Sequence, residues 1–301
     1  MTSIIALANQ KGGVGKTTTA VNLAWYLAAE GWRTLLLDLD PQGNATSSLG
    51  LHKYPDQPTS LDWMLHHAAL DDCLQSTGRE RLSIMGANRD LAAAELDLKT
   101  LQRPQRRLAE LLAPAQHRWD VVIIDCPPSL GLLTVNGLTA AQHVIIPVQC
   151  EYLALEGLAE VTGTIERIGR SLNPSLAVLG LVMTMFDSRT RLSIDVVRDV
   201  HQRYPELMFR ALIPRSVRVA EAPSHGRSIF EYDPGSRGAE AYGLFGTEVI
   251  ARLRLEHSSQ DGEGSTSVAA DAPSAESLTA ATCVNVEVSR QGGGERGDDS
   301  W

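Results

Sequence analysis

The sequence predicts an α/β protein with a doubly wound, mostly parallel sheet and helices on both faces. Short apolar runs alternate with longer stretches of helical apolar spacing through most of the chain. A glycine-rich loop separates the first apolar run from the first helical stretch, and two further runs end in aspartates. Alternating strands and helices need crossover connections, so we expect parallel strands covered by helices on both faces.

Length and composition fit one large globular domain. The chain has 301 residues, 43% of them apolar, which is ordinary for a globular protein. Its apolar runs are too short to span a bilayer, and the first strand begins too early for a signal peptide. A reducing cytoplasm fits the cysteines, which show no C-x-x-C spacing. These are Cys73, Cys126, Cys150 and Cys283.

Charge divides the chain into two parts. The net charge is −9, which argues against nucleic-acid binding by the whole surface. Residues 257–301 hold two arginines and eight carboxylates, a net of −6, which leaves −3 for residues 1–256. The 257–301 segment is rich in Ser, Gly and Ala without periodicity, so we expect a disordered tail. The predicted domain is therefore 1–256.

The glycine-rich loop predicts a phosphate-binding loop, because the apolar run 4–8 reads as a strand and 19–28 as a helix. Glycines let backbone N–H groups turn toward phosphate oxygens, and the helix N-terminus adds positive charge. Lys16 would reach the β- and γ-phosphates, and the Thr17 hydroxyl would bind Mg²⁺. The expected nucleotide contacts of the loop are Lys11, Gly12, Gly13, Val14, Gly15, Lys16, Thr17 and Thr18.

The loop departs from the usual pattern at its start. Gln10 stands where a glycine is usual, and Lys11 adds a second lysine. A solvated glycine turn is one alternative, and a dinucleotide fingerprint is another, although its third glycine is missing. The run Lys-Gly-Gly-Val-Gly-Lys-Thr resembles the deviant loop of the ParA/MinD group of P-loop ATPases. In that group the early lysine reaches the nucleotide of a partner subunit, a role that the resemblance gives to Lys11.

Asp40 ends the second apolar run, 33–40, at the edge where ligands of open α/β sheets bind. We expect it to face the γ-phosphate and Mg²⁺ and to position or activate the attacking water. Alternatively, Asp40 only caps the next segment. The stretch 38–44, Asp-Leu-Asp-Pro-Gln-Gly-Asn, closely resembles the switch motif of chromosomal ParA proteins of the Soj type.

Asp125 follows four apolar residues and precedes a proline-broken loop, as in a Walker B strand. It would hold Mg²⁺ through a water. The sequence Asp-Cys-Pro-Pro-Ser resembles the Asp-x-Pro-Pro of the ParA family. A catalytic thiol is the alternative role for Cys126, but no histidine partner is evident, so we interpret it as structural.

Further elements complete the alternating pattern. The sequence predicts strands at 82–86, 143–148 and 178–186, with a last short strand ending at 212–215. It predicts helices at 59–65, 90–98, 104–112, 151–172, 192–204 and 238–256.

The resemblance also implies a base site and a DNA surface. In the ParA family the loops after the last two strands hold the base, which here gives Met185, Pro214 and Arg215. The tract 213–226 again resembles Soj-type ParA proteins. Arg215 and Arg218 lie three apart, can share a helix face, and suit contact with DNA phosphates. A solvated helix face is the alternative.

The resemblance covers about residues 3–255. It implies an Mg-ATP-dependent ATPase that forms a homodimer with ATP and then binds double-stranded DNA without sequence preference. A ParB-like partner, nucleoid association and chromosome or plasmid segregation follow from it. Its catalytic residues would be Lys11, Lys16, Asp40 and Asp125.

Other functions remain open at this stage. A positioning ATPase for another cargo fits the same motifs. A MinD-like membrane switch would need a basic amphipathic C-terminal helix, whereas this C-terminus is acidic. A nitrogenase-type iron protein would need cluster-ligating cysteines, and neither Cys126 nor Cys150 has such a context.

Overall fold

We describe the fold from a computed structural model. It describes residues 2–54, 56–92 and 94–262. The fold below belongs to the compact unit Met1–Ser259, and residues 260–262 complete its last helix. The predicted disorder of the tail from residue 263 onward lies outside the described residues.

The described residues form one eight-stranded sheet in the order β3-β4-β2-β5-β1-β6-β7-β8. Strands β1 to β8 span Ser3–Leu7, Thr34–Asp38, Leu74–Ser76, Leu82–Met85, Val121–Asp125, His143–Gln149, Ala177–Phe186 and Met208–Pro214. The short edge strand β3 runs antiparallel to β4, and the other neighbours pair in parallel. The predicted fold class is confirmed.

The central strands are apolar throughout because helices cover both of their faces. Every residue of β1, β2 and β5 is buried. Successive side chains of a strand point to opposite faces. In β5, Val122 and Ile124 therefore join one core, whereas Val121 and Ile123 join the other.

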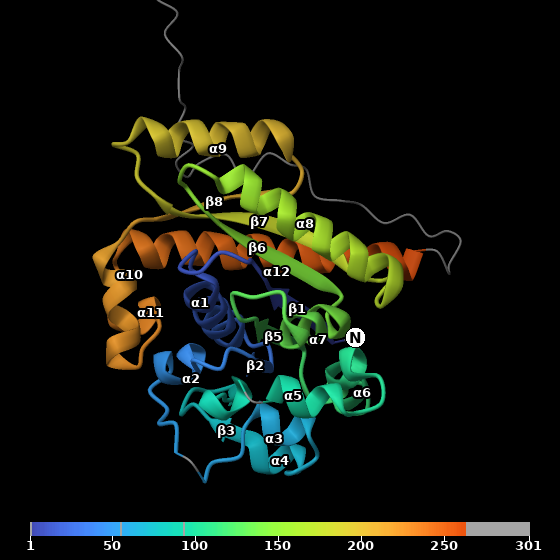
Figure 1. Cartoon of the computed structure of the whole chain (residues 1–301). Helices are drawn as coiled ribbons and strands as arrows, with labels where there is room; N and C mark the ends of the chain where they lie inside the picture. The colour runs from blue at the N-terminus through green and yellow to red at the C-terminus, as the bar shows by residue number, and fades with distance from the viewer. Residues whose placement is uncertain (1, 55, 93, 263–301) are drawn as a thin grey trace, which may run out of the picture. The chain divides into compact units, whose positions relative to one another are not determined.

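Two helical layers enclose these cores (Figure 1). The first core receives side chains from α3 (Ser60–Met64), α4 (Leu70–Cys73), α5 (Ala94–Lys99), α6 (Arg107–Leu112), α7 (Leu132–Ala140), α8 (Ala154–Ser171) and α9 (Arg191–Arg203). The second receives them from α1 (Lys16–Ala29), α2 (Asn44–Ser48), α11 (Ile229–Tyr232) and α12 (Arg237–Gly262), with α10 (Val217–Glu221) packed alongside.

The predicted capped helix near residue 60 is α3. Thr59 and Asp62 close a capping box, in which the Thr59 amide donates to the Asp62 carboxylate over 2.7 Å. The predicted helix 90–98 is instead a 3₁₀ turn, Arg89–Ala92, followed by α5. The last helix ends at Gly262, beyond its predicted end at 256.

The sequence analysis missed α7, because this helix lacks a polar face. It is packed between the sheet and other helices, so its apolar residues show no helical spacing. At Gly137 the helix packs tightly against the residue that follows β5, because a Cβ there would lie 2.8 Å from the Cys126 sulfur. The edge strand β3 was also missed, since it has only three residues.

Six of the parallel strands place their carboxyl ends along one edge of the sheet: β1, β2, β5, β6, β7 and β8. The glycine-rich loop, the predicted catalytic aspartates and the predicted base loops all follow these strands. The fold therefore brings them to the same edge.

Candidate active site

The glycine-rich loop joins β1 to α1 as predicted, with Lys16 as the first helical residue. Gly13 and Gly15 have φ angles of 77° and 87°, a left-handed conformation that side chains disfavour. No side chain in the described part of the chain caps the start of α1. Its first N–H groups are therefore available to an anion, which the helix dipole also favours.

Lys16 is buried beside the acids of the site, with 6% of its surface exposed. Its Nζ donates to the Lys11 carbonyl over 3.1 Å, so the ammonium lies within the loop. Burial lowers the pKa of Lys16, and the nearby carboxylates of Asp125 and Asp40 oppose this shift. A phosphate entering the loop would supply further negative charge and favour the protonated lysine.

Asp125 ends β5 and is fully buried, and among the described residues neither of its carboxylate oxygens has a hydrogen-bond partner. Burial raises its pKa well above the usual value, and the nearby Asp38 adds to the rise, whereas the Thr17 hydroxyl and Lys16 oppose it. An unpaired buried carboxylate is costly and calls for a cation or water. With the Thr17 hydroxyl nearby, these hard oxygen donors fit Mg²⁺.

The described residues hold no cluster of three or more His, Cys, Asp or Glu side chains that suits a metal. This does not argue against magnesium. Mg²⁺ keeps several waters and is usually held by one or two protein groups together with phosphate oxygens. Asp125 and Thr17 would supply an incomplete shell of that kind.

Asp38 is a positioning residue that the site prediction missed. It is fully buried and pairs in register with Asp125 across β2 and β5. Its carboxylate accepts hydrogen bonds from the Asp40 amide (3.1 Å), the Thr46 amide (3.0 Å) and the Thr46 hydroxyl (2.8 Å). Burial raises the pKa of Asp38 to about 6. Asp38 thus fixes both ends of the switch loop, residues 39–45. The sequence feature that could have identified Asp38 is its position two residues before Asp40.

Asp40 lies in the same buried group, with 7% of its surface exposed. One of its oxygens accepts from the Gln42 amide over 2.9 Å, so it also stabilises the turn that follows. Asp40 therefore makes the kind of contact expected from the alternative interpretation, in which it caps the segment that follows it. Its predicted roles toward water and Mg²⁺ stay predictions.

Lys11 lies at the rim of the site rather than inside it. Its side chain forms an ion pair with Glu151, in the segment between β6 and α8, and is 41% exposed. The Lys11 amide donates to Asn9 (3.0 Å), and the Asn9 side chain donates to the Pro147 carbonyl (2.7 Å). The backbone at Lys11 is therefore fixed, while the partner of its ammonium within the described chain is an exposed carboxylate.

The predicted base residues gather beside the loop. The Thr184 hydroxyl donates to the Val14 carbonyl over 2.8 Å, which ties β7 to the phosphate-binding loop. Met185 follows with a φ of 53°, unusual for a non-glycine residue and frequent at functional sites. Pro214 pairs in register with Phe186, and the Arg215 amide donates to the Phe186 carbonyl. Met185, Pro214 and Arg215 thus lie at one end of β7 and β8.

One part of the predicted DNA surface is wrong. Arg215 and Arg218 do not share a helix face, because α10 begins at Val217 and its N-cap is Ser216. Arg215 directly follows β8, which ends at Pro214, and lies before the helix. Arg218 is on α10 and forms ion pairs with Glu221 (3.3 Å) and Asp233 (3.5 Å). Ser216 was the capping signal that places the helix start after Arg215.

Comparison with known proteins decides the family. A family model described as an AAA domain matches residues 2–178. The sporulation initiation inhibitor protein Soj of Bacillus subtilis is 47% identical over 251 residues, covering 83% of this chain and 99% of Soj. The chromosome partitioning protein ParA of Myxococcus xanthus is 45% identical, covering 83% of this chain and 88% of that protein. The chain belongs to the Soj/ParA family of chromosome-partitioning ATPases. The predicted family and ATPase class are confirmed.

Solved structures agree with this assignment of a ParA-type fold. A Mycobacterium smegmatis protein named cobyrinic acid a,c-diamide synthase, with bound ADP and magnesium, is 40% identical and has a TM-score of 0.75. It covers 85% of this chain and 97% of that one. MinD of Pyrococcus horikoshii, complexed with Mg-ADP, is 24% identical and has a TM-score of 0.69. The match covers 85% of this chain and 99% of MinD, and at this identity it supports the fold alone.

The two partitioning proteins are 47% and 45% identical to this chain, compared with 40% for the protein named as a diamide synthase. As a separate observation, none of the helices that the structure describes is both long and apolar enough to cross a membrane.

Proposed function

We propose that this ParA-type ATPase dimerises with Mg-ATP, binds DNA without sequence preference in that state, and segregates chromosomes or plasmids with a ParB-like partner. The observation that carries the proposal is the placement of two lysines on one loop. Lys16 is buried among the acids, whereas Lys11 is at the rim and forms an exposed ion pair with Glu151. A rim lysine can serve a nucleotide bound to a second protomer. Nucleoid association in the cytoplasm would follow from DNA binding.

The reaction is attack of water on the γ-phosphate, and the chain's residues have separate tasks in it. Lys16 and the N–H groups of the loop bind and orient the phosphates. Thr17 and Asp125 would hold Mg²⁺, which neutralises charge on the phosphate oxygens. Asp40 orients the attacking water.

In the dimer, Lys11 of each protomer would face the nucleotide of the other. Closure of the second protomer would exclude water, and the low dielectric would strengthen the contact between the Lys11 ammonium and the charge that develops in the transition state. Dimerisation would thereby complete the site.

Exposed arginines at the carboxyl ends of β7 and β8 support the DNA part of the proposal. Arg189, in the loop before α9, has 86% of its side chain exposed, and Arg218 has 58%. Hydrogen bonds from Arg189 lower the pKa of Asp187 to about 2, and Arg215 adds a smaller effect, so both arginines lie near this carboxylate. The sequence analysis did not single out Arg189. Its exposed place beside Asp187 is visible only in the fold.

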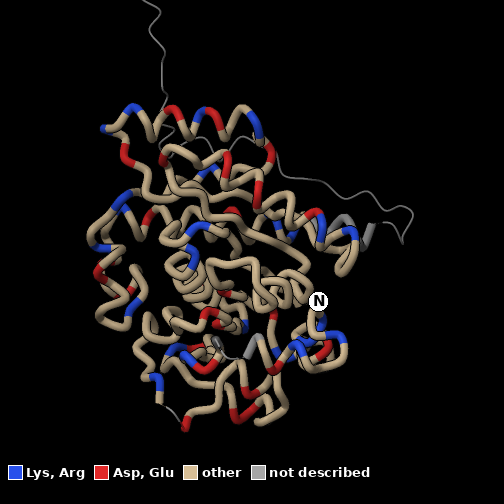
Figure 2. Tube along the Cα trace, in the orientation of Figure 1, with Lys and Arg blue, Asp and Glu red and all other residues tan. Residues whose placement is uncertain are grey.

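The net charge of −3 over residues 1–256 means that DNA binding must use a local surface. Figure 2 shows both signs of charge spread over the tube, with Lys and Arg segments on and beside α10. Two protomers would double such a surface. Contacts to phosphates carry no sequence information, so binding would be insensitive to sequence.

A salt titration of DNA binding with ATP and with ADP tests the proposal. We expect tight binding only with ATP, and an affinity that falls steeply with salt. Arg218→Gln should weaken binding on any duplex and flatten the salt slope by about 2 if one phosphate contact is lost per protomer. Arg210→Gln is the matched control, because Arg210 is an exposed residue near the other end of β8. Equal binding with both nucleotides, or equal slopes for the two variants, would refute the proposal.

The cargo is tested separately by adding a ParB-like protein to the ATPase assay. Stimulation of hydrolysis is expected from a partitioning protein. A positioning ATPase for another cargo would not respond to it. No observation on the described residues favours a MinD-like membrane switch.

A further inference from the structure

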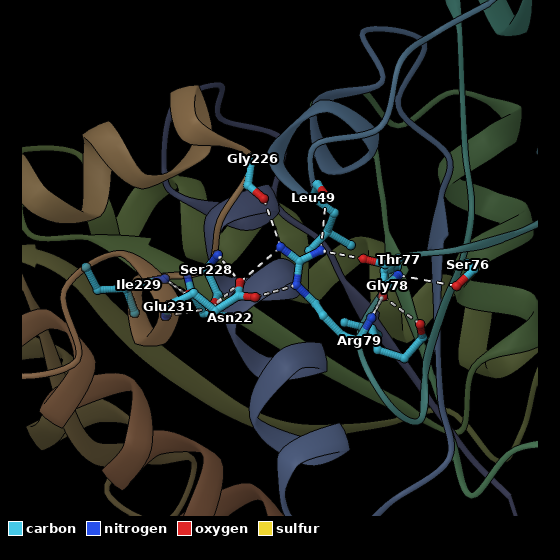
Figure 3. Close-up of polar contacts among 11 residues, drawn as sticks. Asn22, Leu49, Ser76, Thr77, Gly78, Arg79, Gly226, Ser228, Ile229 and Glu231 are labelled. Carbon is cyan, nitrogen blue, oxygen red and sulfur yellow. Dashed lines mark hydrogen bonds and ion pairs between the residues drawn. The ribbon is translucent and has the colours of Figure 1, made fainter.

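Arg79 lies in the turn between β3 and β4, away from the phosphate-binding loop. Figure 3 shows its guanidinium group surrounded by Leu49, Thr77, Gly226 and Glu231. We propose that Arg79 is a positioning residue that couples the switch loop to the α10–α11 segment, residues 216–233, and so makes DNA binding depend on nucleotide. The DNA part of this inference rests on the proposed function.

All five N–H donors of Arg79 are used. Its Nε donates to Glu231 over 2.7 Å and its Nη2 over 3.0 Å, a bidentate pair with one carboxylate. Nη1 donates to the carbonyls of Leu49 (3.1 Å) and Thr77 (3.0 Å). Nη2 also donates to the Gly226 carbonyl over 2.8 Å. With 16% of its side chain exposed, Arg79 is fixed in one geometry that a lysine cannot reproduce.

The first connection leads to the switch loop. Leu49 follows α2 directly, and α2 begins at the end of the loop that contains Asp40. Thr46, within α2, is held by the buried Asp38. A rearrangement of the switch loop when phosphate binds would therefore displace α2 and the Leu49 carbonyl together.

The second connection leads to the α10–α11 segment. Glu231 accepts from the Ser228 amide (2.9 Å) and hydroxyl (3.0 Å), which caps the start of α11. The Ile229 amide donates to Asn22, whose side chain donates to the Thr18 carbonyl in the first turn of α1. The N-terminus of α11 is thus tied both to Arg79 and to the helix of the phosphate-binding loop.

The two connections meet at a close backbone contact. Gly226 has a φ of 64°, and a Cβ there would lie 2.5 Å from the Gly50 Cα. The ends of α2 and of the 3₁₀ turn Ala222–His225 therefore touch without side chains between them. Because the backbones at Gly50 and Gly226 are in direct contact, we expect a shift of α2 to move Gly226 as well.

Arg218 belongs to the segment that would move. It pairs with Asp233, and the Tyr232 hydroxyl donates to Glu221 over 3.1 Å, so α10 is fastened to the end of α11. Arg79 thus links the switch loop to the helix that carries a proposed DNA contact.

Hydrogen–deuterium exchange of residues 216–233 tests the coupling without DNA. In the wild type, a non-hydrolysed ATP analogue should change the exchange rates of this segment relative to the nucleotide-free protein. In Arg79→Gln the switch loop should still respond to the analogue, but the change over 216–233 should disappear. Glu231→Gln, which removes the charge and keeps a side-chain acceptor for the cap, should give the same loss if Arg79→Gln fails to fold. Arg81→Gln is the control, since Arg81 lies in the same turn and pairs only with its exposed neighbour Glu80 among the ion pairs of the described chain.

DNA affinity gives the second readout. Arg79→Gln should bind the ATP analogue within about threefold of wild type. Its DNA affinity with ATP should nevertheless fall at least tenfold, toward the value with ADP. A wild-type segment that does not respond to the analogue, or an Arg79→Gln segment that still does, would overturn the coupling. Failure of the wild type to bind DNA would refute the proposed function instead, and the exchange result would still decide the role of Arg79.

Discussion

The ion pair between Lys11 and Glu151 should hold the rim lysine away from a second protomer. In the structure the Glu151 carboxylate engages the Lys11 ammonium within the same chain. If Lys11 acts across the dimer, this pair must open each time the dimer forms. Glu151→Gln removes the competing charge, so we expect the variant to dimerise more tightly with ATP.

The size of the effect follows from the exposure of the pair. Lys11 and Glu151 are 41% and 34% exposed, and exposed ion pairs are worth about 0.2–1 kcal/mol. Two pairs open per dimer, so dimerisation should become about 0.4–2 kcal/mol more favourable. This corresponds to a dissociation constant lower by a factor of about 2–30.

Sedimentation velocity with a non-hydrolysed ATP analogue measures that constant directly. Glu156→Gln is the matched control, because the substitution removes the same charge from a residue that lines a hollow together with Lys11. We expect Glu156→Gln to lower the dissociation constant of the dimer less than Glu151→Gln does. Added salt should reduce the difference in dissociation constant between the wild type and Glu151→Gln. An unchanged or weaker dimer in Glu151→Gln would refute the view that the pair restrains Lys11.

Four further outcomes are expected. Lys16→Ala should abolish ATP binding, whereas Asp40→Ala should retain it and stop turnover; equal losses of ATP affinity would contradict this division. Lys11→Ala should bind ATP yet remain monomeric by light scattering, and an ATP dimer would argue against action across the interface. The carboxyl carbon of Asp38 should titrate near pH 6 by NMR in the nucleotide-free protein. Since its ordinary pKa is 3.8, ionisation of Asp38 should lower stability as pH rises from about 4 to 6, and a midpoint near 4 would contradict this. Removal of residues 263–301 should leave melting temperature and ATPase activity nearly unchanged, and a drop of several degrees would show that the tail packs on the domain.

The sequence predicted the parts of the site that are local in the chain. The loop from Gln10 to Thr18 could be interpreted because its strand and helix lie directly beside it. Asp40 and Asp125 were found because each ends a run of apolar residues. Buried parallel strands give such runs without help from tertiary contacts.

The missed features depend on contacts between distant segments. Arg79 and Glu231 are 152 residues apart, and neither lies in a recognisable motif. Glu151, the partner of Lys11, also lies far from the loop in the chain, so the ion pair has no local signal. α7 was missed because burial on all sides removes the periodicity that identifies a helix.

The two buried aspartates that are neighbours across β2 and β5 reduce the free energy of unfolding of the whole domain. Asp38 and Asp125 are neighbours in register, and both are raised in pKa by burial. Selection for heat resistance alone would tend to replace one of them by a neutral residue, and activity would be lost with it. Ligands that bind only the folded chain also stabilise it, so bound nucleotide should offset part of this cost. The chain should therefore unfold most readily when its nucleotide site is empty.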